Sequence, residues 1–315
     1  MNQNIYIVGA GAIGKALAVF MKEENKKVLL IWGSVDDEPA EKSKISVRNQ
    51  DGQLFQQEVI TTTFSNLSSI DGIVLIATKT FSNTEIAQKL SGKKGEFSIV
   101  LLQNGLNIEA PFQDFKEVYR CVLFSTSQIL PENNISFKTV TASPVGRIAN
   151  NKTQTEEIVG QINTAQFGFR SEANIEKFVW DKVIVNCAFN SICPLLETDN
   201  GIFQRNKDAM RLAREIILEC VSLAKEYGIS LDKSDIEEKL LFISQKADGQ
   251  LISTYEDIRR NRRTEIDSLN LEIARLADNI GKPDLTAKTK LLGELISIKS
   301  DIGINNITPV THDGG

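Results

Sequence analysis

The chain has 315 residues, of which 41% are hydrophobic and 24% are charged, and its formal net charge is −5 at pH 7. These values are typical of a globular protein long enough for two domains, and they exclude a disordered chain. The acidic balance comes without a basic stripe, which argues against a nucleic-acid partner. No apolar run reaches the roughly 18 residues of a membrane helix and no signal segment follows Met1, so we expect a cytoplasmic protein with no membrane partner.

The first predicted element is a strand that leads through a glycine turn into a helix. An apolar run at residues 5–8 is followed by Gly9-Ala10-Gly11-Ala12-Ile13-Gly14 and by a helix-like stretch at 15–22. Gly9 allows a tight turn, Gly11 lets the backbone approach a phosphate, and Gly14 lets helix and strand pack closely. The helix N-terminus presents N–H groups and partial positive charge. These residues therefore predict a dinucleotide-binding turn.

The rest of the first half alternates short apolar runs with helix-length polar stretches, a rhythm typical of a parallel sheet doubly wound by helices. The predicted strands are residues 28–32, 72–77, 98–102 and 118–124. Residues 45–47 and 54–60, around Asp51-Gly52, predict a hairpin after the second strand. Residues 135–141 and 143–148 predict further strands at the far side of the sheet.

The second half carries apolar residues at helical spacing and predicts an all-α domain. One helix covers residues 210–227 and ends at Gly228, and another runs from Ile266 to Ile280, with Gly281 and Pro283 as stop signals. We place the domain boundary near residue 172. The expected domains are a Rossmann-type domain at 1–172, an α-helical domain at 173–306 and a flexible tail at 307–315.

Histidine and cysteine usage limits the chemistry. The only histidine, His312, lies in the tail, so a proton donor near neutral pH must be a lysine, a tyrosine or a carboxylic acid with a shifted pKa. Cys121, Cys187, Cys193 and Cys220 show no C-x-x-C spacing, which predicts buried free thiols in a reducing compartment and no metal site.

Two polar residues follow strands of the predicted sheet, at the edge where ligands of such sheets bind. Lys79 follows the strand at 72–77, and Asn104 follows the strand at 98–102. The alternatives are a solvated loop lysine and an ordinary Asn-Gly turn.

Lys182, Asn186 and Asn190 recur every four residues and form one polar line on an otherwise apolar helix that begins near Asn174. Two interpretations stay open. The line is either a narrow solvent-facing stripe or a row of donors facing a cleft, in which apolar walls and a cationic neighbour would make a lysine proton available.

A third candidate group joins Ser253 with Thr264, Glu265 and Asp267. Thr264 and Asp267 also suit helix caps, residues 259–263 suit a solvated basic turn, and Glu265 suits the positive end of a helix dipole.

Together these motifs resemble the ketopantoate reductase (2-dehydropantoate 2-reductase) family. The resemblance rests on the glycine turn, Lys79, Gln103-Asn104-Gly105, W-x-K-x-x-x-N-x-x-x-N at 180–190, and Ser253 with R-x-T-E-I-D at 262–267. The family fold is a Rossmann-type domain joined to an all-α domain, the same partition that the periodicity predicts.

The resemblance implies roles for these residues. Lys182 is similar to the general acid that protonates the carbonyl oxygen, and Glu265 to the group that binds the substrate's distal hydroxyl and orients the lysine. Asn186, Asn190 and Ser253 are similar to substrate ligands, and Asn104 and Lys79 to groups that border cofactor and substrate. A positioned cation would stabilise the charge that hydride transfer builds on oxygen.

The cofactor is left open by the residues themselves. The second strand ends at Trp32-Gly33-Ser34, which places Ser34 at the cofactor but offers neither an acid for a ribose 2′-hydroxyl nor an arginine for a 2′-phosphate. Asp36, Asp37, Lys42 and Lys44 come later. The resemblance implies NADP, and NAD is not excluded.

Three functions follow as hypotheses. The first is NADPH-dependent reduction of 2-dehydropantoate to (R)-pantoate, for pantothenate biosynthesis. The second is an NAD-dependent D-2-hydroxyacid dehydrogenase acting on another 2-oxo acid. The third is a non-catalytic NAD(P)-binding regulator, against which the joint presence of Lys182, Asn186, Ser253 and Glu265 argues. Whether the chain forms a homodimer is left open.

Overall fold

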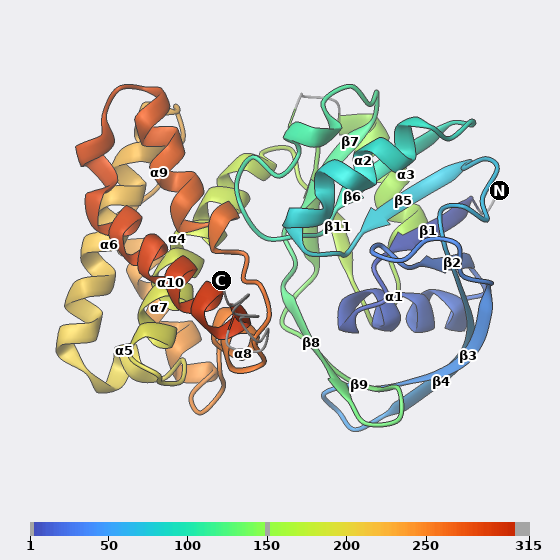
Figure 1. Ribbon diagram of the computed structural model, residues 1–315, viewed down its shortest axis with the longest axis horizontal. Coiled ribbons are helices and arrows are strands. Elements are labelled where there is room, and N and C mark those ends of the chain that lie inside the picture. Colours follow the sequence, from blue (N-terminus) through green and yellow to red (C-terminus); the bar gives the residue numbers. More distant parts are fainter. Residues whose placement is uncertain (1–2, 149–151, 306–315) are drawn as a thin grey trace, which may run out of the picture. The chain divides into compact units, whose positions relative to one another are not determined.

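The computed structural model describes residues 3–148 and 152–305. The chain divides into two compact units, called here unit 1 (Met1–Asn104 and Ile108–Ile175) and unit 2 (Gly105–Asn107 and Glu176–Gly315) (Figure 1). The boundary near residue 172 stays a prediction about independently folding domains. The tail at 307–315, with His312, lies outside the described residues. Among the helices of the described ranges, none has the length and apolar character of a membrane span.

Unit 1 is built on one mixed sheet of eleven strands within the described residues, in the order β11-β10-β7-β6-β5-β1-β2-β4-β3-β9-β8. Its parallel centre comprises β7 (Val118–Cys121), β6 (Phe97–Leu101), β5 (Gly72–Ile76), β1 (Asn4–Val8), β2 (Lys27–Ile31) and β4 (Leu54–Thr62). The flanks comprise β3 (Glu41–Arg48), β8 (Ser125–Leu130), β9 (Asn134–Thr139), β10 (Ser143–Gly146) and β11 (Phe169–Ser171). The predicted Rossmann-type architecture is therefore confirmed, with antiparallel pairs added at β3–β4, β8–β9 and β7–β10.

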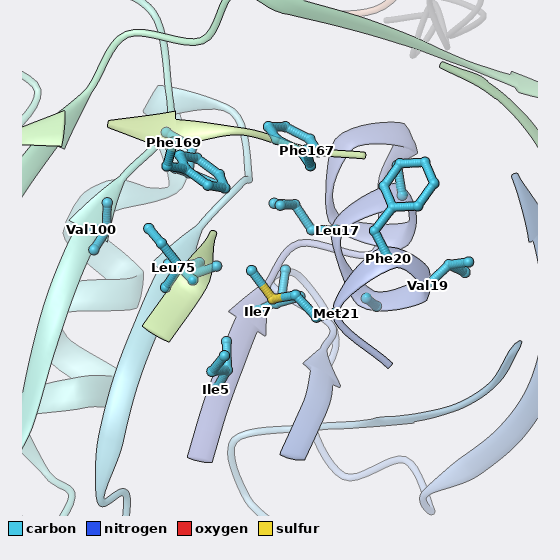
Figure 2. Packing of buried hydrophobic residues seen from close by; sticks show 14 of the residues in the cluster. Ile5, Ile7, Leu17, Val19, Phe20, Met21, Leu75, Val100, Phe167 and Phe169 are labelled. Atoms are coloured by element: carbon cyan, nitrogen blue, oxygen red, sulfur yellow. The ribbon is translucent and has the colours of Figure 1, made fainter. Parts of the chain in front are cut away.

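The central strands are buried on both faces, as parallel strands are. The helices of unit 1 are α1 (Ala12–Glu23), α2 (Asn83–Ser91) and α3 (Lys152–Ile162), with 3₁₀ turns η1 (Thr80–Ser82) and η2 (Ala110–Phe112). Ile7 and Leu75 pack with Leu17 and Phe20 of α1 in one cluster (Figure 2). Val8 and Ile76, one residue further along each strand, pack with α2 in another. Alternate side chains thus point to opposite faces, and each fully buried one contributes about 1.5–3 kcal/mol.

Two strands of unit 1, β8 and β11, are not predicted from the sequence, because neither contains an apolar run of strand length. β8 is a mostly exposed strand at the end of the sheet, and β11 is only three residues long. The hairpin predicted around Asp51-Gly52 is confirmed. Its first strand, β3, begins at Glu41 and not at the predicted Ile45, because the residues before Ile45 pair in register with β4. These residues are polar, so the apolar pattern does not indicate them.

The regular elements in the described residues of unit 2 are all helices. Its elements are α4 (Ile175–Leu195), α5 (Ile202–Arg205), α6 (Lys207–Glu226), α7 (Lys233–Lys246), α8 (Ser253–Arg259), η3 (Ile266–Ser268), α9 (Asn270–Asn279), η4 (Pro283–Thr286) and α10 (Ala287–Asn305). The helix predicted at 210–227 is confirmed as α6, which starts at Lys207 because the Asn206 side chain accepts hydrogen bonds from the amides of Asp208 and Ala209.

The prediction of one helix from Ile266 to Ile280 is wrong. The chain forms the short turn η3 and then α9, separated at Leu269, whose φ of −111° and ψ of −106° are not helical. The carbonyl of Ser268 accepts a 2.9 Å hydrogen bond from the amide of Leu106. In a continuous helix the carbonyl of Ser268 would accept a hydrogen bond from an amide one turn later, and here it accepts from Leu106 instead. The local sequence contains no signal for this long-range bond.

The four cysteines are confirmed as free and buried. Burial raises the pKa of the Cys193 thiol to about 12. Burial also raises the pKa of the Cys187 thiol, so neither Cys187 nor Cys193 provides a thiolate at neutral pH.

Candidate active site

The glycine turn of unit 1 has a specific steric basis at Gly9 and Gly14. Gly9 follows β1 with a φ of +118°, and a Cβ there would lie 2.8 Å from the backbone of Ala77 and Thr78. A Cβ on Gly14 would lie 1.9 Å from the carbonyl oxygen of Gly9. Both positions thus need glycine for the fold itself.

Gly11 differs, because a Cβ there would meet nothing within 4 Å. It is the N-cap residue of α1 and makes no side-chain cap, and the first turn of α1 holds no acidic residue. The turn therefore leaves an open space beside N–H groups and a helix dipole, which is what the pyrophosphate of a dinucleotide requires. Residues 9–14 fit such a cofactor.

Polar side chains gather where β5 and β6 end, as expected for this edge of the sheet. Gln103 is buried, and its Nε2 donates to Asn83 Oδ1 at 2.6 Å and to Thr78 Oγ1 at 3.3 Å. Asn104 and Lys79 are half-buried on the same two connections. Sequence reasoning assigned roles to Lys79 and Asn104, named Gln103 only as part of the Gln103-Asn104-Gly105 motif, and missed Thr78, whose only signal is its place after a buried strand.

In unit 2, α4 carries the predicted polar line. Lys182 and Asn186 are half-buried, and Asn190 is 2% exposed. The interpretation as a solvent-facing stripe is therefore wrong at Asn190. Neighbouring residues of α4 are buried on several sides, so the line lies on a helix surrounded by other elements.

Asn190 connects α4 with the start of α8. Its Nδ2 donates to the carbonyl of Asn186 at 3.0 Å, and its Oδ1 accepts from Ser253 Oγ and from the amide of Thr254, both at 3.4 Å. The residue at the N-cap of α8, Ile252, supplies no side-chain cap. Asn190 therefore caps α8 from another helix, which gives it a structural role beside the substrate contact that the resemblance implies.

This capping role makes a stability prediction. We expect Asn190→Ala to lower the free energy of unfolding by about 1 kcal/mol, because the buried amide of Thr254 loses its acceptor. Ser253→Ala is the matched control, since Ser253 is exposed and that amide bond remains. Urea denaturation of both variants checks this, and equal midpoints would contradict the capping role.

Glu265 is half-buried and directly precedes η3. No α-helix starts there, so the interpretation of Glu265 as a helix-dipole residue is wrong. The buried Asn270 at the start of α9 donates to the carbonyl of Cys187, next to Asn186, at 3.3 Å. This bond fixes the segment that follows Glu265 against the middle of α4, the helix that carries Lys182.

The basic turn at 259–263 is not merely solvated. Arg262 forms a 2.7 Å ion pair with the buried Asp257, and Arg263 pairs with Asp267 at 3.3 Å. Through these contacts the turn is fixed to α8 on one side and to η3 on the other. Over the described ranges, the acidic, cysteine and histidine side chains form no cluster of three that could hold a metal ion.

The comparisons with known proteins cover both units. The domain described as Ketopantoate reductase PanE/ApbA matches residues 5–150, and the one described as Ketopantoate reductase PanE/ApbA C terminal matches residues 174–299. The chain belongs to the ketopantoate reductase family. The two matched domains follow the division into a Rossmann-type unit and a helical unit described above, and together they include every candidate residue named here.

Individual members of the ketopantoate reductase family are distant from this chain. The 2-dehydropantoate 2-reductase of Streptococcus pyogenes serotype M18 is 24% identical over 304 residues, covering 95% of this chain and 98% of the relative. A D-mandelate dehydrogenase solved with NADH and anilino(oxo)acetate has a TM-score of 0.83 at 20% identity, covering 95% of this chain and 99% of that one. A dimeric ketopantoate reductase from Staphylococcus aureus has a TM-score of 0.79 at 20% identity, with the same coverage.

Proposed function

We propose that this protein reduces 2-dehydropantoate to (R)-pantoate with a nicotinamide cofactor, a step of pantothenate biosynthesis. The observation that carries the proposal is a half-buried lysine, Lys182, on a helix that is largely buried from Val183 onward, within the C-terminal region of the ketopantoate reductase family. The names of the relatives support the substrate, and the dimeric Staphylococcus aureus structure supports a homodimer as the proposed assembly.

The proposed mechanism assigns one task to each residue. The bound nicotinamide supplies the hydride. Lys182 donates a proton to the ketone oxygen, because the chain has no histidine in its described part and a lysine amine is the nearest substitute. Glu265 positions that amine and binds the distal hydroxyl, while Asn186, Asn190 and Ser253 hold the substrate.

The cofactor is held, in this proposal, by residues of unit 1. Gly9, Ala10, Gly11, Ala12, Ile13 and Gly14 bind the pyrophosphate, and Ser34, Lys79 and Asn104 border the remainder. The open space beside Gly11 supports this assignment. The family resemblance implies NADP.

A second candidate is an NAD-dependent D-2-hydroxyacid dehydrogenase that acts on another 2-oxo acid. The likeness to the D-mandelate dehydrogenase supports it, because that structure holds NADH and an oxo acid. The same lysine chemistry serves both reactions, so the two candidates differ in the substrate pocket and in cofactor choice.

Substrate and cofactor can be tested together by following nicotinamide absorbance with NADPH and NADH against a panel of 2-oxo acids. We expect 2-dehydropantoate to give the highest kcat/KM of the panel. Faster turnover of an aromatic oxo acid would support the dehydrogenase instead. Cofactor binding without turnover of any panel member would support a regulator and contradict both enzymatic functions.

A further inference from the structure

The end of β2 has an unusual steric restriction at Gly33. In dinucleotide-binding domains the residues directly after the second strand meet the 2′ substituent of the cofactor's adenosine ribose. Gly33 is buried here, and a Cβ on it would lie 2.5 Å from Thr78 Cγ2. Contacts of that length do not occur, so a side chain fits at position 33 only if Thr78 moves.

Thr78 is not free to move without cost. Its hydroxyl accepts the 3.3 Å hydrogen bond from Gln103, and Gln103 in turn is fixed by its 2.6 Å bond to the buried Asn83. A β-branched side chain has few χ1 rotamers, so this bond keeps the methyl group over Gly33. Position 33 therefore accepts neither the acid typical of NAD enzymes nor the arginine typical of NADP enzymes.

The segment that follows Gly33 is strongly acidic. Residues 33–41 contain four carboxylates and no lysine or arginine, and Asp36, Asp37 and Glu38 are exposed. The amide of Asp37 donates to Ser65 Oγ at 3.2 Å, and the carbonyl of Glu38 accepts from Asn66 Nδ2 at 2.7 Å. These bonds hold the acidic residues beside the end of β2.

Lys89, which contacts the acidic segment, is already paired, and so are Lys42, next to Glu41 in the chain, and Lys93, which contacts the residues on either side of Ser65 and Asn66. Lys89 contacts Asp36 at 2.6 Å and Glu85 at 2.7 Å. Lys93 donates to the carbonyls of Phe64 and Leu67 at 2.7 and 2.8 Å, and Lys42 pairs with Glu58 at 2.5 Å. A phosphate carrying about two negative charges would meet fixed carboxylates here, whereas a ribose hydroxyl would meet hydrogen-bond acceptors and Ser34.

We propose that this protein selects NADH over NADPH, because the acidic segment at 34–38 repels a 2′-phosphate and the Gly33–Thr78 contact leaves no room for an arginine at position 33 that would offset this charge. The inference rests on the proposed use of a nicotinamide cofactor and departs from the NADP preference that the family resemblance implies. The steric contact excludes an arginine at position 33, and the acidic segment disfavours the 2′-phosphate by charge.

Binding to the purified full chain tests this without any oxo acid. Quenching of intrinsic tryptophan fluorescence gives Kd for NADH and NADPH separately, and we expect NADH to bind about tenfold more tightly. The difference should shrink as salt is raised, because part of it is electrostatic repulsion. Equal affinities, or tighter NADPH binding, would overturn the proposal.

Two sets of variants separate the charge from the steric contact. Asp36→Asn with Asp37→Asn should lower the NADPH Kd several-fold and should not lower the NADH Kd, and asparagine suits the positive φ of Asp37. Asp51→Asn, an exposed acid at the β3–β4 hairpin, is the charge control and should change neither Kd. Gly33→Arg should improve NADPH binding only together with Thr78→Ser, which keeps the hydroxyl for Gln103 and removes the methyl group.

Lys79 directly follows Thr78, so the experiment must also test whether Lys79 binds the 2′-phosphate of NADPH. If Lys79→Ala abolished a strong NADPH affinity of the unchanged chain, a phosphate site at Lys79 would replace the proposed selection. If the protein binds NADH tightly but does not reduce 2-dehydropantoate, the proposed preference for NADH is supported and the proposed substrate is wrong. The two proposals can therefore fail separately.

Discussion

Lys182→Ala is expected to lower kcat for 2-dehydropantoate reduction by about 10²- to 10⁴-fold, the range in which a positioned proton donor contributes. Without the amine, the ketone oxygen must take its proton from water while charge builds up on it. The Kd of the cofactor should stay unchanged, because the proposed cofactor residues belong to unit 1. Steady-state kinetics and fluorescence binding measure the two quantities.

Lys177→Ala is the matched control for this variant. Lys177 lies on the same helix, α4, one turn before the start of the polar line, and it is exposed. Its loss should leave kcat within about twofold of the unchanged protein, as expected for a solvated surface residue. Similar losses in both variants would show that α4 tolerates no change of charge, and the assignment of Lys182 would fail.

Gly14→Ala is expected to destabilise the protein by about 3 kcal/mol, the upper range for overpacking a close contact. The added Cβ would lie 1.9 Å from the carbonyl oxygen of Gly9. The oxygen is a backbone atom and the position of a Cβ is fixed by its own backbone, so neither atom can rotate away. The N-terminus of α1 must then shift from β1, which carries part of the core. Thermal or urea unfolding measures the loss.

Gly11→Ala separates binding from folding in the same turn. A Cβ at Gly11 meets no protein atom within 4 Å, so unfolding should change by less than about 1 kcal/mol. The methyl group would nevertheless occupy the space proposed for the pyrophosphate, and the cofactor Kd should rise about tenfold. If Gly11→Ala bound cofactor as well as the unchanged protein, the proposed phosphate position would be wrong.

Much of unit 1 follows from sequence because its signals are local. The runs that form β1, β5 and β6 are apolar on both faces, since the sheet is covered on both sides, and the glycine turn sits between β1 and α1. The long helix α6 of unit 2 also follows from its local apolar spacing, although the prediction began at residue 210 and missed the Asn206 cap. Such elements are defined by their own residues.

The features that escaped prediction depend on partners distant in the chain. Leu269 is non-helical because Ser268 bonds to Leu106, and Asn190 is buried because it caps α8. The restriction at Gly33 exists only because β5 brings Thr78 beside the end of β2. Each requires knowledge of which segments meet, and no local pattern contains that information.

The central claim is that the amine of Lys182 donates the proton, and chemical rescue tests it most directly. Primary amines small enough to enter the site are added to Lys182→Ala, and the rate of nicotinamide oxidation with 2-dehydropantoate is followed. We predict that the rate rises with amine concentration and depends on the pKa of the amine, while Lys177→Ala does not respond. No rescue by any amine, in a variant that still binds cofactor and substrate, would contradict the account.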